Sequence, residues 1–221
     1  MYQYDFNELL VRVILPGLAD TFIMLFVSAV TCGVLGFAVA LTLVTTDPRG
    51  LRPSPLVNRI VSGLVSLIWA MPYIVLAISI LPITRMVVGT SIGVWAGIFA
   101  ITFAAFPLIA RLLENSFKEV NPSLIEAARS LGATDAQITF RVIVAEAVPS
   151  VVAQSTLGWI SLLHYTTTAG LIGAGGLGAV ALTYGYQNFN DRVMYGTVMI
   201  LVVIVALIQL GGNALYRWIK Q

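Results

Sequence analysis

The chain has 221 residues, of which 58% are hydrophobic and 10% are charged, and its formal net charge is +2. Soluble domains carry about 25% charged residues, so this composition excludes an ordinary soluble protein. The small net charge gives no indication of nucleic-acid binding. Cys32 is the only cysteine, so no internal disulfide can form.

Long apolar runs organise the sequence. Five of them extend over about 20 residues without Asp, Glu, Lys or Arg, the length that an α-helix needs to cross a bilayer. The first 20 residues lack a basic start and a small-residue cleavage site, so they are interpreted as a short amphipathic lead-in and not as a signal peptide. The expected fold class is all-α, a polytopic membrane protein with one transmembrane domain over residues 17–212. The expected spans are residues 21–44, 60–81, 91–110, 150–172 and 193–215.

Small residues and prolines mark positions within and between these spans. The first span has a small residue at every fourth position, which lets another helix approach closely. These residues are Ser28, Cys32, Gly36 and Ala40. Pro72 predicts a kink in the second span because it frees a backbone carbonyl. A short loop is expected over residues 82–90, and Gly93 and Gly97 form a small-xxx-small pair in the third span.

A polar, charged stretch separates the third and fourth spans, between Asn121 and Pro149. Asn121 is a good N-cap, and the proline after it suits the first helical position, where no backbone donor is needed. Gly132 stands where a C′ glycine ends a helix. Thr134, with a glutamine three residues later, predicts a capping box at the start of a second helix. The stretch is therefore expected to form two short helices joined by a glycine turn. We call residues 121–149 the docking segment.

The basic residues indicate the orientation in the membrane. If the docking segment is cytoplasmic, nine of the 12 Lys and Arg residues lie inside, in agreement with the positive-inside rule. The N-terminus is then expected outside and the C-terminus in the cytoplasm. The inner residues are Arg49, Arg52, Arg59, Arg111, Lys118, Arg129, Arg141, Arg217 and Lys220, and the outer ones are Arg12, Arg85 and Arg192.

The glycines between Gly173 and Gly178 spell G-x-G-x-x-G. A nucleotide-binding interpretation is rejected, because that motif requires a preceding strand in a βαβ unit and this one follows a membrane helix. A tight outer loop is expected instead. The sequence also lacks G-x-x-x-x-G-K-[ST], so the chain is not expected to bind ATP. No catalytic residue, metal site or cofactor is predicted.

His164, the only histidine, lies beside Tyr165 and three threonines in the fourth span. It could be a proton relay or a solute ligand. The favoured interpretation is a neutral imidazole hydrogen-bonded inside the bundle. The polar cluster around it suits a protein interface or a wet cavity better than lipid. Tyr165, Thr168 and Met71 are the candidate residues of a translocation path, although methionine more often fills gaps in packing.

The spans contain no buried carboxylate, lysine or arginine by sequence, whereas an ion-coupled carrier places such groups near the midplane. Energy is therefore expected from a separate subunit, and a path is expected between two copies of the chain. A purely structural membrane subunit is a further alternative, but it has no need of a docking segment.

The docking segment resembles the EAA loop of permease subunits of ABC importers. The residues that carry the likeness are Glu126, Ala127, Ala128, Gly132 and the run Glu146-Ala-Val-Pro149. The resemblance implies that these helices dock into a groove of an ATPase subunit, with Glu126, Ala127, Ala128, Gly132 and Ala133 at the contact. Adjacent alanines make a thin surface, and glycine allows a sharp turn. The alternative is an ordinary amphipathic hairpin.

Further segments resemble the permease of bacterial methionine ABC importers. They are residues 71–75, 81–93, 109–115, 173–178 and 184–186. This resemblance implies a type I importer permease in a bacterial inner membrane, acting as a homodimer with two ATPase subunits inside, which bind the ATP, and a methionine-binding lipoprotein outside. The importer of another small amphipathic solute, such as a betaine or a different amino acid, is the alternative within this class.

Overall fold

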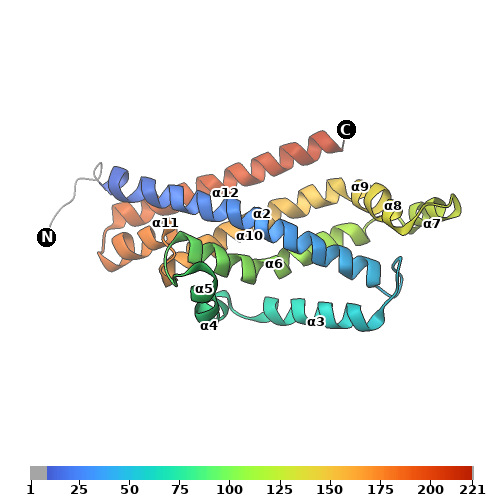
Figure 1. The fold of residues 1–221 in the computed structure, drawn as a ribbon. Helices are drawn as coiled ribbons and strands as arrows, with labels where there is room; N and C mark the ends of the chain where they lie inside the picture. Colours follow the sequence, from blue (N-terminus) through green and yellow to red (C-terminus); the bar gives the residue numbers. More distant parts are fainter. Residues whose placement is uncertain (1–8, 221) are drawn as a thin grey trace. The chain divides into compact units, whose positions relative to one another are not determined.

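The computed structural model describes residues 9–220, and every regular element in that range is a helix (Figure 1). The expected all-α fold class is confirmed. By length and composition, three of these helices can cross a membrane, and the total is up to five if each of two bent helix pairs counts as one span. The elements are η1 Leu10–Ile14, α2 Leu15–Thr46, α3 Pro55–Ala70, α4 Tyr73–Ser79, α5 Leu81–Val88, α6 Val94–Lys118, α7 Pro122–Ser130, α8 Asp135–Gln137, η2 Ile138–Ile143, α9 Val144–Glu146, α10 Val148–Ala169, η3 Gly170–Ile172, α11 Gly176–Val180, η4 Ala181–Gln187 and α12 Asp191–Ile219.

The chain divides into two compact units. The first unit comprises Met1–Cys32, Met71–Ala105 and Trp159–Ile208, and the second comprises Gly33–Ala70, Phe106–Gly158 and Gln209–Gln221. Each unit is held together by contacts between segments that are distant in the sequence.

Close backbone packing at glycines organises the first unit. A Cβ on Gly178 would collide with the carbonyl oxygen of Thr167, and one on Gly170 would collide with the backbone of Ala179. α11 therefore lies directly against the end of α10. The hydroxyl of Thr21 accepts a hydrogen bond from the Leu177 N–H at 2.8 Å, which joins the start of α2 to α11.

An apolar core organises the second unit. Its buried members come from α2, from α6 and its C-terminal turn, and from the segment between η2 and α10. They are Ala40, Leu113, Phe117, Val120, Ile138, Ile143 and Ala147. The rings of Phe37 and Phe117 meet edge to face, with 5.9 Å between centroids. The docking segment is thus fixed to the ends of two long helices.

The small-residue stripe of α2 faces other helices, as predicted. Ser28 and Cys32 are fully buried in the first unit, where the Cys32 Sγ lies 3.7 Å from the Thr102 carbonyl oxygen. In the second unit, a Cβ on Gly36 would come within 3.1 Å of the Ala110 nitrogen.

Several expected boundaries were wrong. The second span is not one helix over residues 60–81, because the chain breaks at Met71 and Pro72, whose ψ of 132° is extended. The expected loop over residues 82–90 is largely helix α5, since proline fits a first helical turn and Gly89 ends the helix in the left-handed conformation.

The expected boundaries of the first and third spans also need correction. η1 runs directly into α2, so the lead-in is no separate segment over its described residues. Gly93 precedes α6 and has φ +91, so it forms no helical pair with Gly97. α6 continues beyond residue 110 to Lys118 and so includes Glu114, a nearly buried carboxylate that lies beyond the expected end of the third span. The C-terminal half of the glycine motif opens α11, so the expected outer loop is shorter than residues 173–178.

Two glycine substitutions should have opposite effects on stability. Gly178→Ala places a methyl group against the Thr167 carbonyl, so the free energy of unfolding should fall by about 2 kcal/mol or more. Gly196→Ala, in α12, meets no heavy atom within 4 Å and should leave stability unchanged or raise it by up to about 1 kcal/mol. Thermal unfolding of both variants in detergent measures the difference. Equal melting temperatures would contradict the packing described for α11.

Candidate functional site

The first helix of the docking segment, α7, has the predicted caps. The Asn121 side chain accepts a hydrogen bond from the Ser123 N–H at 3.0 Å, and Pro122 is the first helical residue. At the other end, the N–H groups of Gly132 and Ala133 donate to the carbonyl oxygens of Arg129 and Ala128, at 3.0 and 3.1 Å. With Gly132 at φ +78, this is a Schellman motif, which satisfies carbonyls that the helix end leaves free.

The second helix begins with the predicted capping box. The Thr134 N–H donates to Gln137 Oε1 at 2.9 Å, and the Gln137 N–H donates to Thr134 Oγ1 at 3.4 Å. α8, η2 and α9 then run continuously to Glu146, and Pro149 lies in the first turn of α10. The turn between the two helices is therefore set by side chains and backbone of the segment itself.

Ion pairs connect the docking segment and its neighbouring helix to the loop after α2. The Arg52 Nε donates to Asp135 Oδ2 at 2.7 Å, and Lys118 Nζ lies 3.3 Å from Asp47 Oδ2. The pKa of the Asp47 carboxyl is lowered, first by the hydrogen bond from the Arg49 N–H and then by Lys118. Asp47 therefore stays ionised, and its pairing is lost only in acid.

α7 and the residue after it expose large apolar side chains at the surface. The helix has no buried residue, and Leu131, directly after it, is 88% exposed. Leu124 is also exposed, and so are Glu126 and Ala127. Ile125, Ala128 and Ala133 are partly buried against the apolar core of the second unit. The helix thus packs weakly inward and presents an outward face that combines leucine and alanine with charged side chains.

The structure divides the five predicted docking residues between these two sides. Glu126, Ala127 and Gly132 are exposed, whereas Ala128 and Ala133 are half-buried and lie against the core. The sequence analysis placed Ala128 on the contact surface only. The exposure of Leu131 does not follow from the sequence either, because an apolar residue at the end of an amphipathic helix is usually buried.

The candidate path residues lie in the first unit. The ring of Tyr165 packs edge to face on Tyr73, with 5.0 Å between centroids, and Tyr73 was not singled out from the sequence. The Thr168 hydroxyl donates to the His164 carbonyl oxygen at 2.9 Å, so it is hydrogen-bonded within its own helix. Met71 is 44% exposed at the break before α4. The structure therefore brings Tyr165 to the residue that follows this break, and it shows no contact that joins Thr168 to them.

Two polar groups of this unit differ from expectation. His164 is exposed on α10, so the interpretation of a histidine held inside the bundle is wrong for the isolated chain. The Tyr73 hydroxyl is buried and has no hydrogen-bond partner among residues 9–220. A buried hydroxyl without a partner costs free energy, so Tyr73 is a polar group of this unit whose hydrogen bond the described residues do not supply.

Comparison with known proteins defines the class. Residues 46–221 match the family described as binding-protein-dependent transport system inner membrane component. A probable D-methionine transport system permease of Vibrio cholerae is 37% identical over 90% of this chain and 88% of its own length. The methionine import system permease of Bacillus subtilis is 34% identical over 81% of each chain.

Solved structures agree with this result. An inward-facing form of a methionine ABC transporter matches all of this chain and all of its own, with a TM-score of 0.93 and 38% identity. The chain therefore belongs to the family of inner-membrane permeases of binding-protein-dependent ABC importers, in the branch of the bacterial methionine importer permeases. Members of this family are non-catalytic, multi-pass subunits, and a partner subunit binds the ATP.

Proposed function

We propose that two copies of this chain form the translocation path of an ATP-driven methionine importer. The docking segment transmits the movement of a cytoplasmic ATPase subunit, and an extracytoplasmic lipoprotein delivers the solute. The observation that carries the proposal is the docking segment itself, because it combines a rigid turn with an exposed apolar face. An exposed apolar surface of this kind, rimmed by charge, is typical of a protein interface.

To transmit movement, the docking segment must be rigid and must be firmly attached to the membrane helices. The caps of α7 and α8 fix the turn, and the apolar core joins both helices to α2 and α6. Because the core cannot deform freely, a displacement of the docking segment carries the ends of the long helices with it. ATP binding would close the ATPase pair and open the path outward, and hydrolysis would return the path to the inward-facing state.

The charges and the ion pairs support one orientation of the chain in the membrane. The basic residues predict that the loop after α2 and the docking segment share the cytoplasmic side. The ion pair between Arg52 and Asp135 joins these two segments, which supports the same assignment. The N-terminus is proposed outside and the C-terminus inside, although residues 1–8 lie outside the described range.

The solute is proposed from the chemistry of the spans and from the named relatives. A zwitterion is net neutral, so backbone groups and hydroxyls can meet its ends, and an apolar tail suits walls of Leu, Ile, Val, Met and Phe. Methionine satisfies both conditions, and the Vibrio and Bacillus relatives are named for its transport. Tyr165, Thr168 and Met71 are proposed along the path. A betaine or another amino acid remains the competing solute.

An ion-coupled carrier is disfavoured. The nearly buried carboxylate, Glu114, lies near the end of α6 and forms ion pairs at 2.7 Å with both Arg111 and Lys118. Both oxygens of this carboxylate are held by cationic side chains of the same helix, whereas a coupling site must be free to gain and lose its ion.

The docking proposal is tested by two glycines with the same backbone conformation. Gly132 has φ +78 and Gly89 has φ +85, and a Cβ on either meets no heavy atom within 4 Å. Valine should cost about 1–2 kcal/mol at each position, because a side chain disfavours positive φ. Gly132→Val should weaken co-purification of the ATPase subunit and uncouple transport, whereas Gly89→Val should not. Equal retention of the ATPase by both variants would show that the turn is not at the interface.

The solute is tested by uptake into proteoliposomes that contain the permease, its ATPase and its binding protein. Labelled methionine should accumulate only when ATP is supplied on the side of the membrane that carries the ATPase subunit. Unlabelled methionine should compete with the label. Lysine and glutamate should compete poorly, since the proposed path residues Tyr165, Thr168 and Met71 offer no charge to balance theirs. If betaine or lysine displaced the label as well as methionine does, the solute assignment would fail while the importer class would stand.

A further inference from the structure

We propose that Arg111 is a positioning residue that couples the docking segment to α3. Through this link, movement of the docking segment shifts α3 and the chain break that follows it. The proposal rests on the proposed function, because it assumes that the docking segment is driven by an ATPase. It concerns a set of contacts that we call the Arg111 network, made of Arg111, Glu114, Lys118, Ser62 and Ser66.

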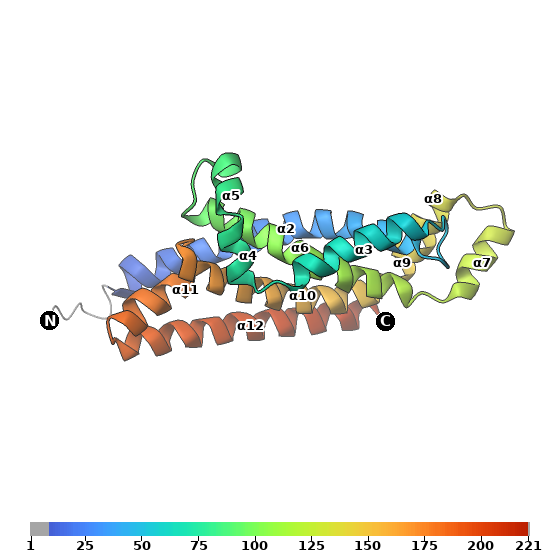
Figure 2. The ribbon, with the colours of Figure 1, turned by 90° about the horizontal axis from the view of Figure 1, so that it is seen from below.

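Arg111 bridges α6 and α3 with a single guanidinium group. Its Nη1 donates to Glu114 Oε2 at 2.7 Å, and its Nη2 donates to the hydroxyls of Ser62 and Ser66, both at 2.8 Å. The same Nη2 lies 3.1 Å from the Ser62 carbonyl oxygen. α3 runs alongside this part of α6 in Figure 2. The planar fork of arginine thus holds two successive turns of α3 against one turn of α6.

The network continues toward the docking segment. Glu114 is only 4% exposed, and its Oε1 accepts from Lys118 Nζ at 2.7 Å. Lys118 is the last residue of α6, and α7 begins at Pro122. A nearly buried carboxylate requires its cationic partners, so Arg111 and Lys118 are fixed in position by Glu114. The contacts therefore form an unbroken chain from Ser66 of α3 to Lys118 at the end of α6, close to the start of the docking segment.

Within one copy of the chain, polar contacts are the main interactions that hold α3, because few of its side chains are buried. It has 16 residues, of which only Val65 is buried. Besides the Arg111 contacts, Asn58 Nδ2 donates to the Leu43 carbonyl oxygen at 2.8 Å. A helix held by a few hydrogen bonds at one face can shift as a unit when their partner moves, whereas an interdigitated helix resists.

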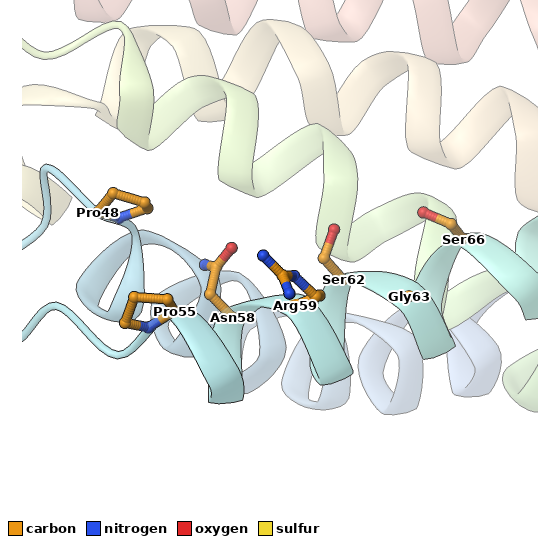
Figure 3. Close-up of a pocket in the computed structure, with 7 residues that line it drawn as sticks. All are labelled: Pro48, Pro55, Asn58, Arg59, Ser62, Gly63 and Ser66. Carbon is orange, nitrogen blue, oxygen red and sulfur yellow. The ribbon is translucent and has the colours of Figure 1, made fainter.

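A cavity that opens to the surface lies beside α3, so side chains of this chain do not fill the space on that side of the helix. Its volume is about 430 Å³, and Figure 3 shows Ser62 and Ser66 pointing from α3 toward α6 along its side. The lining residues are Pro48, Pro55, Asn58, Arg59, Ser62, Gly63 and Ser66. The cavity therefore lies on the side of α3 that carries the polar contacts.

The consequence concerns the break at the end of α3. α3 ends at Ala70, and the next two residues are Met71 and Pro72, which interrupt the helix. Irregular backbone at membrane depth is tolerated where it is covered by protein or lines a cavity. A shift of α3 is transmitted along the chain to this break, which is where the candidate path residue Met71 lies. Arg111 thus joins the energy-transducing segment to the proposed path without touching the solute.

The test removes only the two serine hydroxyls that α3 contributes to the network. A loss of coupling can then be distinguished from misfolding. The double variant Ser62→Ala with Ser66→Ala keeps the Arg111–Glu114 pair, so it should assemble normally with the ATPase. Arg111→Lys keeps the charge beside Glu114, but one ammonium cannot replace the fork that joins Glu114 to both serines. Arg59→Gln is the control, since it removes an exposed guanidinium from the same helix and leaves the network intact.

Two readouts are used in proteoliposomes that contain the whole complex. The first is the number of ATP molecules hydrolysed per methionine carried, which should rise at least fivefold in the serine variant and in Arg111→Lys, with an unchanged KM for methionine. Arg59→Gln should keep the wild-type ratio. A purely structural role predicts rescue by lysine and a constant ratio, and that outcome would overturn the proposal.

The second readout does not depend on the solute. Leu67→Cys places a thiol on an exposed position of the last turn of α3, and the native Cys32 is buried. Its labelling rate should change at least threefold when a non-hydrolysable ATP analogue is added, and this change should be lost in the serine variant. An unresponsive thiol in the otherwise wild-type complex, or a response retained without the serines, would overturn the proposal. Nucleotide-dependent labelling without methionine uptake would instead refute the solute assignment alone.

Discussion

The second unit depends on one apolar core that membrane helices and a polar hairpin share. Ile138 and Ile143 of the hairpin are buried with Leu113 and Phe117 of α6 and with Ala40 of α2. Complete burial of side chains of this size contributes about 1.5–3 kcal/mol each, which is enough to fix a segment whose own surface is polar. α7 is a short helix with no fully buried residue, so the partly buried Ile125 and Ala128 depend on this core to hold the helix in place.

Local chemistry made the docking segment predictable. The N-cap at Asn121, the turn at Gly132 and the capping box at Thr134 each depend on residues within four positions, so sequence spacing was sufficient to find them. The division of its alanines was not predictable in the same way. Ala128 lies against the core and Ala127 faces outward, and only the packing of α7 on other segments decides which is which.

The apolar helices were predictable in position and less so in extent, and the five expected spans require that each of two bent helix pairs counts as one span. Hydropathy found the spans, but it ended the third at Ala110 because charged residues follow. α6 continues because Glu114 forms ion pairs with residues one turn before and after it. These pairs offset the free-energy cost of burying most of a carboxylate. The break at Pro72 was expected as a kink. The helix α5 after it was missed because Pro82 was interpreted as the start of a loop and not as part of a first helical turn.

The candidate path was the least predictable part. Tyr165 was chosen for its polar neighbours, yet the nearby threonine hydroxyls of Thr167 and Thr168 bond to carbonyls of their own helix. The contact that distinguishes Tyr165 is the ring of Tyr73, which lies more than 90 residues earlier in the chain. Such a pair depends on tertiary structure, and no periodicity in a single sequence reports it. The family assignment, by contrast, rests on whole-chain similarity and does not depend on these residues.

The central claim is that the outward face of the docking segment meets the ATPase subunit, and photo-cross-linking from single cysteines tests it most directly. A benzophenone attached at Leu131→Cys or Ala127→Cys should join the permease to the ATPase in membranes, and the buried Cys32 should contribute little background. The same probe at Phe189→Cys, which is equally exposed but lies on the proposed outer side, should yield no such product. An ATPase cross-link from Phe189, with none from the docking segment, would contradict both the orientation and the docking assignment.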